Sequence, residues 1–457
     1  MRPFLCFQIS IPSPAQRGRV REGAATEQAA SRIASYIARA LTRLAACLAL
    51  CASLTAAAET ISIACSALGR ELELCREGAQ AWAKATGNAV RLVPVPNSAS
   101  ERLALFQQIL AAHASDIDVF QLDVVWSGIL AAHLADLAPL AGNATRDHMP
   151  AILAGAMVHG RLVALPWYAD VGVLYYRKDL LDKHRARVPQ TWTELADTAR
   201  RIQSAEHAGG NAKLWGFVWQ GRAYEGLTCN ALEWIASRGG GNVVDVDGKP
   251  RADSAAARSA LRDAAGWVND VSPPGVLNYA EEEARALFQS GNAVFMRNWP
   301  YAWALANAPD SPVRGQVGIA PLPAGDDDHE RVGTLGGGQL SVSRYSPRAA
   351  SAAGLVVYLT SAVEQKRRAI AGGYNPTIAR LYTDSEVLAA NPFLSALQPL
   401  VEHAVTRPSG SVGTRYNQVS AKIWSAAHRA LAHQQSAEQA LGDLQRDLER
   451  LRRVGRW

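Results

Sequence analysis

The chain of 457 residues lacks the short motifs that identify several large classes of enzyme. It contains no Gly-x-Ser-x-Gly nucleophile elbow, no phosphate-binding loop, no His-Glu-x-x-His metal motif and no dinucleotide-binding glycine pattern. Hydrolase, kinase and dehydrogenase functions are therefore disfavoured. No uncharged apolar run reaches the 20 or so residues that a membrane-spanning helix needs.

Cysteine is also scarce, with six residues in the chain, of which Cys65, Cys75 and Cys229 follow residue 58. No pair has the spacing of metal ligands, and we expect neither a metal nor another cofactor. In an oxidising compartment Cys65 and Cys75 could form a disulfide, because they lie at the end of a predicted strand and in the next helix. The alternative is that all three are small buried hydrophobic residues. Asp326–His329 follows two prolines and is interpreted as a solvated turn.

The excess of positive charge is confined to the start of the chain. Residues 1–58 hold seven arginines against two glutamates, which leaves +1 of the formal +6 for the rest and gives no support for nucleic-acid binding. Arg32, Arg39 and Arg43 precede the uncharged stretch 44–58, which ends in three alanines, as in a secretory signal peptide. We interpret residues 1–58 as this signal plus a non-native leader, and predict an exported, soluble, periplasmic protein.

Alternating strand and helix patterns after residue 58 predict an α/β protein whose chain crosses between two lobes more than once. A turn at Pro166 is predicted to begin the second lobe. In α/β lobes, ligands lie beyond the carboxyl ends of the strands. The predicted strands are 60–65, 89–95, 116–122, 172–176, 292–297, 317–320 and 339–343, and the predicted helices are 75–87, 101–113, 193–203, 224–238, 255–269, 281–290 and 347–359, followed by a mostly helical stretch.

The aromatic residues are more informative than the charges. All 12 tryptophans follow residue 58, and several stand beside Asp, Asn or Gln, in 166–170, 215–221 and 298–303. A sugar ring has apolar faces that stack on such rings and hydroxyls that bond to the polar neighbours. The pattern favours a saccharide pocket, although tryptophans also fill hydrophobic cores.

Longer motifs point the same way. The segments 165–181 and 118–126 resemble the extracellular solute-binding proteins of ABC sugar importers. The segments 215–221, 224–226, 295–303, 320–323 and 334–337 together resemble the trehalose/maltose-binding branch of that family. The resemblance extends from about Glu59 to about Arg450.

The resemblance implies a set of ligand contacts. Tyr374–Pro376 would play a supporting role. The acidic run 281–283 begins a predicted helix, where its negative charge offsets the helix dipole, and needs no other role. After residue 337 the family pattern expects an aromatic that stacks on the sugar, but this chain has Gly338, so the exact ligand is not implied. The residues expected to contact the sugar are Glu71, Arg102, Asp123, Tyr168, Asp170, Trp299, Gly337 and Arg407.

The resemblance also implies the architecture and the function. The fold would be a two-lobed periplasmic binding protein with a hinge, residues 59–165 and 312–361 forming one lobe and 166–311 and 362–457 the other. The protein would close as a monomer on a disaccharide, trehalose or maltose, and deliver it to the transmembrane permease subunits of an ABC importer. The alternative is a secreted glycoside hydrolase with paired carboxylates. A polyamine or metal ligand is disfavoured because Arg407 would repel a cation.

Overall fold

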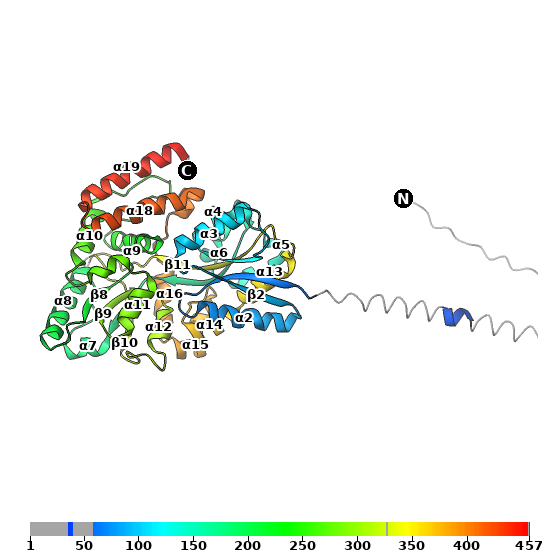
Figure 1. Cartoon of the computed structure of the whole chain (residues 1–457), viewed down its shortest axis with the longest axis horizontal. Coiled ribbons are helices and arrows are strands. Elements are labelled where there is room, and N and C mark those ends of the chain that lie inside the picture. The colour runs from blue at the N-terminus through cyan, green and yellow to red at the C-terminus, as the bar shows by residue number, and fades with distance from the viewer. Residues whose placement is uncertain (1–34, 40–57, 326–327, 456) are drawn as a thin grey trace, which may run out of the picture. The chain divides into compact units, whose positions relative to one another are not determined.

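Two separate β-sheets form the frame of residues 59–457 in the computed structural model (Figure 1). The structure describes residues 35–39, 58–325, 328–455 and 457. Most of the predicted signal peptide, and Asp326 and Asp327 of the predicted solvated turn, lie outside the described residues. Within them, no helix is both long and apolar enough to cross a membrane.

The first sheet has the strand order β2-β1-β3-β11-β6. Its three parallel strands, β1 (Thr60–Ser66), β2 (Ala89–Val95) and β3 (Val119–Asp123), confirm the predicted strands near these positions. Between them run α2 (Glu71–Thr86), which ends at the left-handed Gly87 (φ 77°), and α3 (Ala99–Ala111). The carboxyl ends of β1 and β3 therefore meet at one edge, as the sequence pattern requires.

The antiparallel half of this sheet corrects one prediction. The turn expected at Pro166 is wrong, because β6 (Leu165–Val171) runs straight through that proline and pairs with β11 (Leu335–Val342). The β6–β11 register shifts between Gly338 and Gln339, where Gln339 faces Pro166. A proline cannot donate to the strand ladder, so a local irregularity accommodates it without ending the strand.

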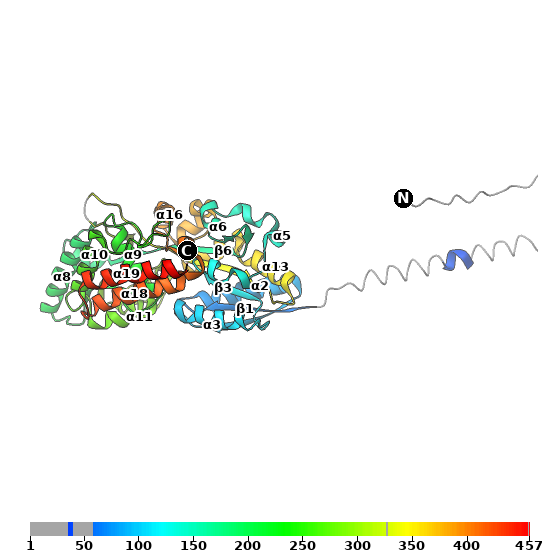
Figure 2. The same cartoon turned by 90° about the horizontal axis from the view of Figure 1, so that it is seen from above.

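The second sheet has the order β10-β7-β9-β8. Helices α9, α10, α18 and α19 pack on one another beside it, with the last two lying together in both views (Figures 1 and 2). The strands are β7 (Val173–Arg177), β8 (Trp215–Val218), β9 (Ala293–Asn298) and β10 (Val317–Pro321), and the helices named are α9 (Glu225–Ala236), α10 (Ala255–Trp267), α18 (Tyr416–Leu431) and α19 (Ala437–Gly455).

The remaining elements cover the sheets and connect them. Most of the predicted helices are confirmed with shifts of a few residues at their ends. The short hairpin β4 (Met157–Val158) and β5 (Arg161–Leu162) was not predicted. The remaining helices are α4 (Ser127–Leu130), α5 (Ala138–Ala141), α6 (Pro150–Ala154), α7 (Lys178–Lys183), α8 (Trp192–Ala208), α11 (Glu281–Gln289), α12 (Ala302–Ala306), α13 (Ala349–Leu359), α14 (Ala362–Gly372), α15 (Ser385–Ala390), α16 (Leu394–Glu402) and α17 (Ser409–Val412).

Two strands lie in a different sheet from the one that the predicted lobe division gives them. β6 belongs to the first sheet, although residues 166–171 were assigned to the second lobe, and β10 belongs to the second sheet, although 317–321 were assigned to the first. The chain crosses between the sheets at Gly172, where an added Cβ would lie 2.0 Å from a carboxylate oxygen of Glu233. This close approach, and not the proline, marks the crossing; the rest of the lobe division stays a prediction.

Many of the tryptophans that suggested a saccharide pocket are core residues. Trp219 and Trp234 are buried, with ring centroids 5.1 Å apart in an edge contact, and Trp192 and Trp267 pack in the same cluster. Trp167 is buried as well. Aromatic contacts of this kind stabilise the core of the second sheet's helical layer, which accounts for four of the 12 tryptophans.

Cys65 in β1 and Cys75 in α2 are fully buried and form a disulfide, which decides between the two alternatives left by the sequence. Cys229 has a free, buried thiol. The disulfide ties the first strand to the first helix beside the pocket described below.

Opening the Cys65–Cys75 disulfide should lower the free energy of unfolding by about 2–3 kcal/mol, because it closes a short loop in the unfolded chain. Urea denaturation with and without dithiothreitol measures this, and the C65A/C75A variant serves as the control that should not respond to the reductant. Thiol titration shows whether the disulfide is reduced. If it is reduced and the unfolding transition of the wild type still does not move, the expectation is wrong.

Candidate functional site

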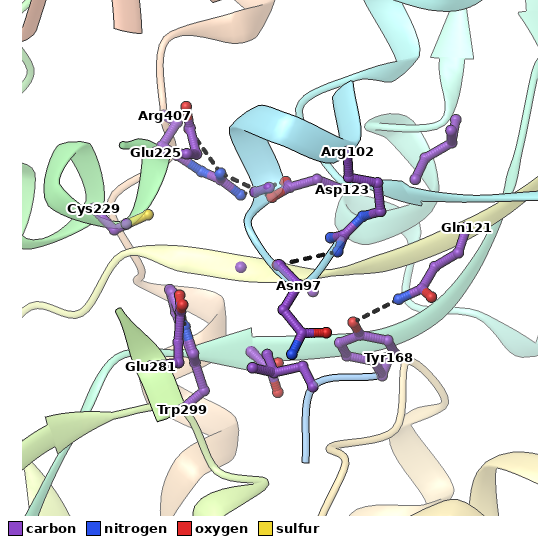
Figure 3. A pocket seen from close by; sticks show the side chains of 17 residues that line it. Asn97, Arg102, Gln121, Asp123, Tyr168, Glu225, Cys229, Glu281, Trp299 and Arg407 are labelled. Carbon is purple, nitrogen blue, oxygen red and sulfur yellow. Dashed lines mark hydrogen bonds and ion pairs between the residues drawn. The ribbon is translucent and has the colours of Figure 1, made fainter. Parts of the chain in front are cut away.

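A cavity that opens to solvent is lined by residues from the sides of both sheets (Figure 3), and its empty space, open solvent included, is about 610 Å³. Three groups of residues line it: the ends of β1 and β3 with the start of α3, the crossing strands β6 and β11, and side chains from the second sheet's side. The lining residues are Leu68, Asn97, Ala99, Arg102, Gln121, Leu122, Asp123, Tyr168, Asp170, Glu225, Gly226, Cys229, Glu281, Trp299, Gly336, Gly337 and Arg407.

The structure brings together seven of the eight residues expected to contact a ligand. Glu71 is the exception, because it is 1% exposed and does not line the cavity. The other seven residues around the cavity are Arg102, Asp123, Tyr168, Asp170, Trp299, Gly337 and Arg407.

Arg407 joins the two sides of the cavity. Its guanidinium donates to both carboxylate oxygens of Asp123, at 2.6 and 3.1 Å, and to Glu225 at 2.9 Å (Figure 3). Burial disfavours the charged guanidinium, but Asp123 and its other neighbours hold the pKa of Arg407 above its ordinary value. The residue was expected as a free donor to a ligand; most of its hydrogen-bonding capacity is instead used inside the protein.

Glu225 is the residue that fixes Arg407 from the second side. It occupies the first turn of α9, where the helix dipole favours a negative charge. Besides Arg407 it accepts hydrogen bonds from Tyr416 and from Ser420 at 2.6 Å. Burial raises the pKa of Glu225, and Arg407 opposes that shift. Glu225 therefore positions Arg407 and has little capacity left for a ligand.

Arg102 projects from α3 toward the cavity but is held by its own loop. Its Nη1 donates to the carbonyl oxygens of Pro96 and Asn97, at 3.0 and 3.3 Å, and the guanidinium lies 5.3 Å from the Trp126 ring centre. The helix begins after Ser98, whose side chain accepts from the Glu101 amide. This cap fixes the start of α3 and thereby the position of Arg102.

Glu71 lies behind the cavity wall and supports it. It accepts hydrogen bonds from Ser66 and from Gln121 Nε2, the latter at 2.6 Å. Gln121 in turn donates to the Tyr168 hydroxyl at 3.3 Å (Figure 3). The first-turn glutamate of α2 therefore lies behind Gln121 and Tyr168, and these two side chains line the cavity where Glu71 does not.

Asp170 is the lining carboxyl group with an unused hydrogen-bond acceptor. Its side chain lies on β6 and is 6% exposed, and its Oδ1 has no hydrogen-bond partner among the described residues. Burial, reinforced by the negative charge of Glu71, raises the pKa of Asp170 to about 8. A buried acceptor without a partner is costly unless something donates to it.

Trp299 follows β9 and is held on several sides. The Arg297 guanidinium lies 3.9 Å from its ring centre, and its Nε1 donates to Glu281 at 3.3 Å. A Cβ at Gly336 would lie 3.0 Å from the ring, so the absence of a side chain on β11 lets the ring approach the strand. The ring is thereby fixed at the edge of the cavity.

Gly338 does not leave open space where the family pattern expects an aromatic. A Cβ there would lie 2.5 Å from the Tyr168 ring, which is the cross-strand partner on β6. Gly337 has φ of +125°, and a Cβ there would lie 2.4 Å from the Tyr168 carbonyl oxygen. Tyr168 therefore covers this part of β11 and takes the place that a side chain on the strand would fill.

Several lining residues were not predicted from the sequence. Glu225 lay in a motif that was noted, and Glu281 was explained by its place at the start of a helix. Gln121 lay within a predicted strand, where period-2 alternation could have assigned it to the same face as Asp123. For Asn97 and Cys229 the sequence offered no signal. No group of three or more His, Cys, Asp or Glu that could hold a metal occurs among the described residues.

Sequence comparison identifies the family. The profile of the family described as bacterial extracellular solute-binding protein matches residues 73–366. The chain belongs to this family. The resemblance to the solute-binding proteins of ABC sugar importers is thereby confirmed, and so is the two-lobed α/β fold that it implied.

Named relatives of this solute-binding protein cover most of its length. A probable ABC transporter-binding protein of Deinococcus radiodurans is 47% identical over 88% of this chain and 95% of its own. The structure of maltose-bound MalE3 of T. maritima matches with a TM-score of 0.82 and 39% identity, covering 86% of this chain and 100% of its own. A mannitol-binding protein of Pseudomonas aeruginosa is 26% identical over 70% of this chain and 77% of its own.

Replacing Arg407 with methionine should lower the free energy of unfolding of this solute-binding protein by about 3–5 kcal/mol at pH 7, because the buried Glu225 and the partly buried Asp123 lose their cation. Urea denaturation measures the loss. Arg222→Met is the matched control: Arg222 pairs with Glu101 at the surface, and such pairs contribute less than about 1 kcal/mol. Equal losses in the two variants would contradict the assignment of Arg407 as the buried link.

Proposed function

We propose that this protein is the substrate-binding component of an ABC importer, which captures a disaccharide, trehalose or maltose, in the cavity between its sheets and delivers it to the membrane permease. It acts in the periplasm as a soluble monomer. The proposal combines the family membership with the chemistry of the cavity wall.

The observation that carries the proposal is the pairing of Asp170 and Trp299 at one cavity. Asp170 offers a buried carboxyl oxygen that lacks a partner, and Trp299 offers an aromatic ring with a fixed orientation. A sugar hydroxyl can donate to the first while an apolar sugar face stacks on the second. Asn97, Gln121 and Glu281 add polar groups around the same space.

The charges of the cavity favour a neutral ligand. The guanidinium of Arg407 is bound to Asp123 and Glu225, so it does not call for an anionic ligand. With a pKa of about 8, Asp170 is mostly protonated at neutral pH in the empty protein, which weakens its attraction for a cation. A polyol or sugar, which is rich in hydroxyls and uncharged, fits this balance best.

The named relatives support a hydroxyl-rich ligand and leave its length open. One solved relative is described as maltose-bound and another relative as mannitol-binding. The first has the higher identity to this chain, which supports the disaccharide. These relatives are binding proteins, whereas the alternative of a glycoside hydrolase would need Asp170 and a second carboxylate to act on a glycosidic bond.

Titration of the purified protein with maltose, trehalose, mannitol and glucose tests the proposal directly. We expect heat of binding by calorimetry and a change of tryptophan fluorescence with maltose or trehalose at micromolar concentration, and weaker binding of glucose. Release of glucose from either disaccharide, in proportion to protein, would show the hydrolase alternative. Preference for mannitol would replace the disaccharide with a polyol, and no response to any of the four would contradict the proposal.

Affinity for the bound disaccharide should rise with pH up to about 8 and then level off. Below the pKa of about 8 in the empty protein, Asp170 must lose a proton before a sugar hydroxyl can donate to its carboxylate. The rise is at most tenfold per pH unit for one released proton. Calorimetry from pH 6 to 9 measures it, and Asp170→Asn should flatten the profile and lower the affinity at pH 8.5 by roughly 30-fold or more. An unchanged affinity in Asp170→Asn removes this residue from the site.

A further inference from the structure

Arg368 is a buried arginine directly behind the wall of the cavity. It lies on α14 and its exposed fraction is 1%. Its guanidinium is 3.7 Å from the ring centre of Trp167, 4.6 Å from that of Tyr374 and 5.5 Å from that of Tyr168. None of its three side-chain nitrogens has a hydrogen-bond partner among the described residues. Such a charge is costly to bury, so its retention needs an explanation.

The nearest carboxylate links Arg368 to the cavity. Nη2 of Arg368 lies 3.9 Å from Oε1 of Glu71, and the same oxygen accepts the hydrogen bond from Gln121. Gln121 donates onward to the hydroxyl of Tyr168, a lining residue. A chain of contacts thus runs from α14 through α2 and β3 to β6.

Arg368 differs from the other buried arginines near the cavity. Arg297 forms a salt bridge with Glu233, and Arg407 forms one with Asp123 and one with Glu225. Arg368 has no carboxylate within hydrogen-bonding distance among the described residues. Its positive charge can therefore stabilise the ionised form of the carboxylates around it.

Asp170 is the second carboxylate that this charge reaches. Burial raises the pKa of Asp170 most, and the charges of Glu71 on α2 and Asp123 on β3 raise it further. Arg368 on α14 and Arg297 on β9 act in the opposite direction. The remaining titratable groups that interact with Asp170 are phenols whose pKa burial raises, and which stay neutral below pH 10: Tyr168, Tyr175, Tyr374 and Tyr382.

We propose that Arg368 is a positioning residue of the ligand site: it stacks on Trp167, next to Tyr168, and supplies the positive charge that balances the buried carboxylates of Glu71 and Asp170. The proposal rests on the proposed function, since Asp170 is the expected hydroxyl acceptor. Arg368 does not touch the ligand. It sets the pH range over which Asp170 can accept a hydrogen bond from a sugar hydroxyl, and it holds the Glu71–Gln121–Tyr168 wall in place.

The test replaces Arg368 with methionine and, separately, with glutamine. Both variants lack the charge, and one that folds is enough for the test. Maltose affinity is measured by calorimetry from pH 6 to 9.5. Loss of the nearby cation should raise the pKa of Asp170. We therefore expect the rise of affinity to occur at a pH roughly 1 unit higher, and the affinity at pH 7 to fall about tenfold. Arg368→Lys keeps the charge and should stay within about threefold of the wild type, with its pH profile unmoved.

A second measurement separates this inference from the proposed function. The carboxyl ¹³C shift of Asp170, assigned with Asp170→Asn, follows its titration in the empty protein, where the neutral variants should raise the midpoint. Arg367→Met is the control, because Arg367 is the next residue on α14 and pairs with Glu77 and Glu364. If no sugar binds to the wild type, the proposed function fails and the titration still decides the role of Arg368. An unmoved midpoint, or equal loss of affinity in the lysine and neutral variants without a change of pH profile, overturns the proposal.

Discussion

The contact of Arg407 with Asp123 and Glu225 is the interaction on which the cavity depends. It connects the end of β3 in the first sheet to the start of α9 beside the second, and it is buried, so removing one partner leaves charge without compensation. Around it, the paired strands β6 and β11 of the first sheet carry Tyr168, Asp170 and the glycines that line the cavity. Strand pairing and the buried guanidinium of Arg407 therefore assemble the site from distant parts of the sequence.

The buried charges of this site fall into two groups. Arg297 is hydrogen-bonded to Glu233, and Arg407 to Asp123 and Glu225, whereas Asp170 Oδ1 and the guanidinium of Arg368 have no hydrogen-bond partner among the described residues. Buried polar or charged groups without partners lower stability, and they are found where a ligand or a regulated charge provides the missing partner. Among the residues that line the cavity, Asp170 Oδ1 is the buried acceptor that has no hydrogen-bond partner within the described part of the chain.

Much of the fold was predictable from local patterns, and the errors have identifiable causes. The hydrophobic periodicity and the helix end at Gly87 predicted the first parallel strands and the helices between them, because these signals are local in the sequence. Pro166 was misjudged since a proline is tolerated where the ladder shifts register, and the true crossing at Gly172 depends on Glu233, a residue distant in sequence. The resemblance to a family located seven lining residues. It could not show that Glu71 acts through Gln121, that Arg407 is already paired, or that Arg368 lies behind Tyr168, because these are long-range contacts.

The glycine run on β11 limits how such a pocket can diversify. Gly336, Gly337 and Gly338 lie so close to Trp299 and to β6 that a side chain at any of the three would collide with an aromatic ring or with the backbone. In this chain a change of ligand preference therefore has more room on the opposing aromatic rings and on the loop around Asn97 than on β11 itself.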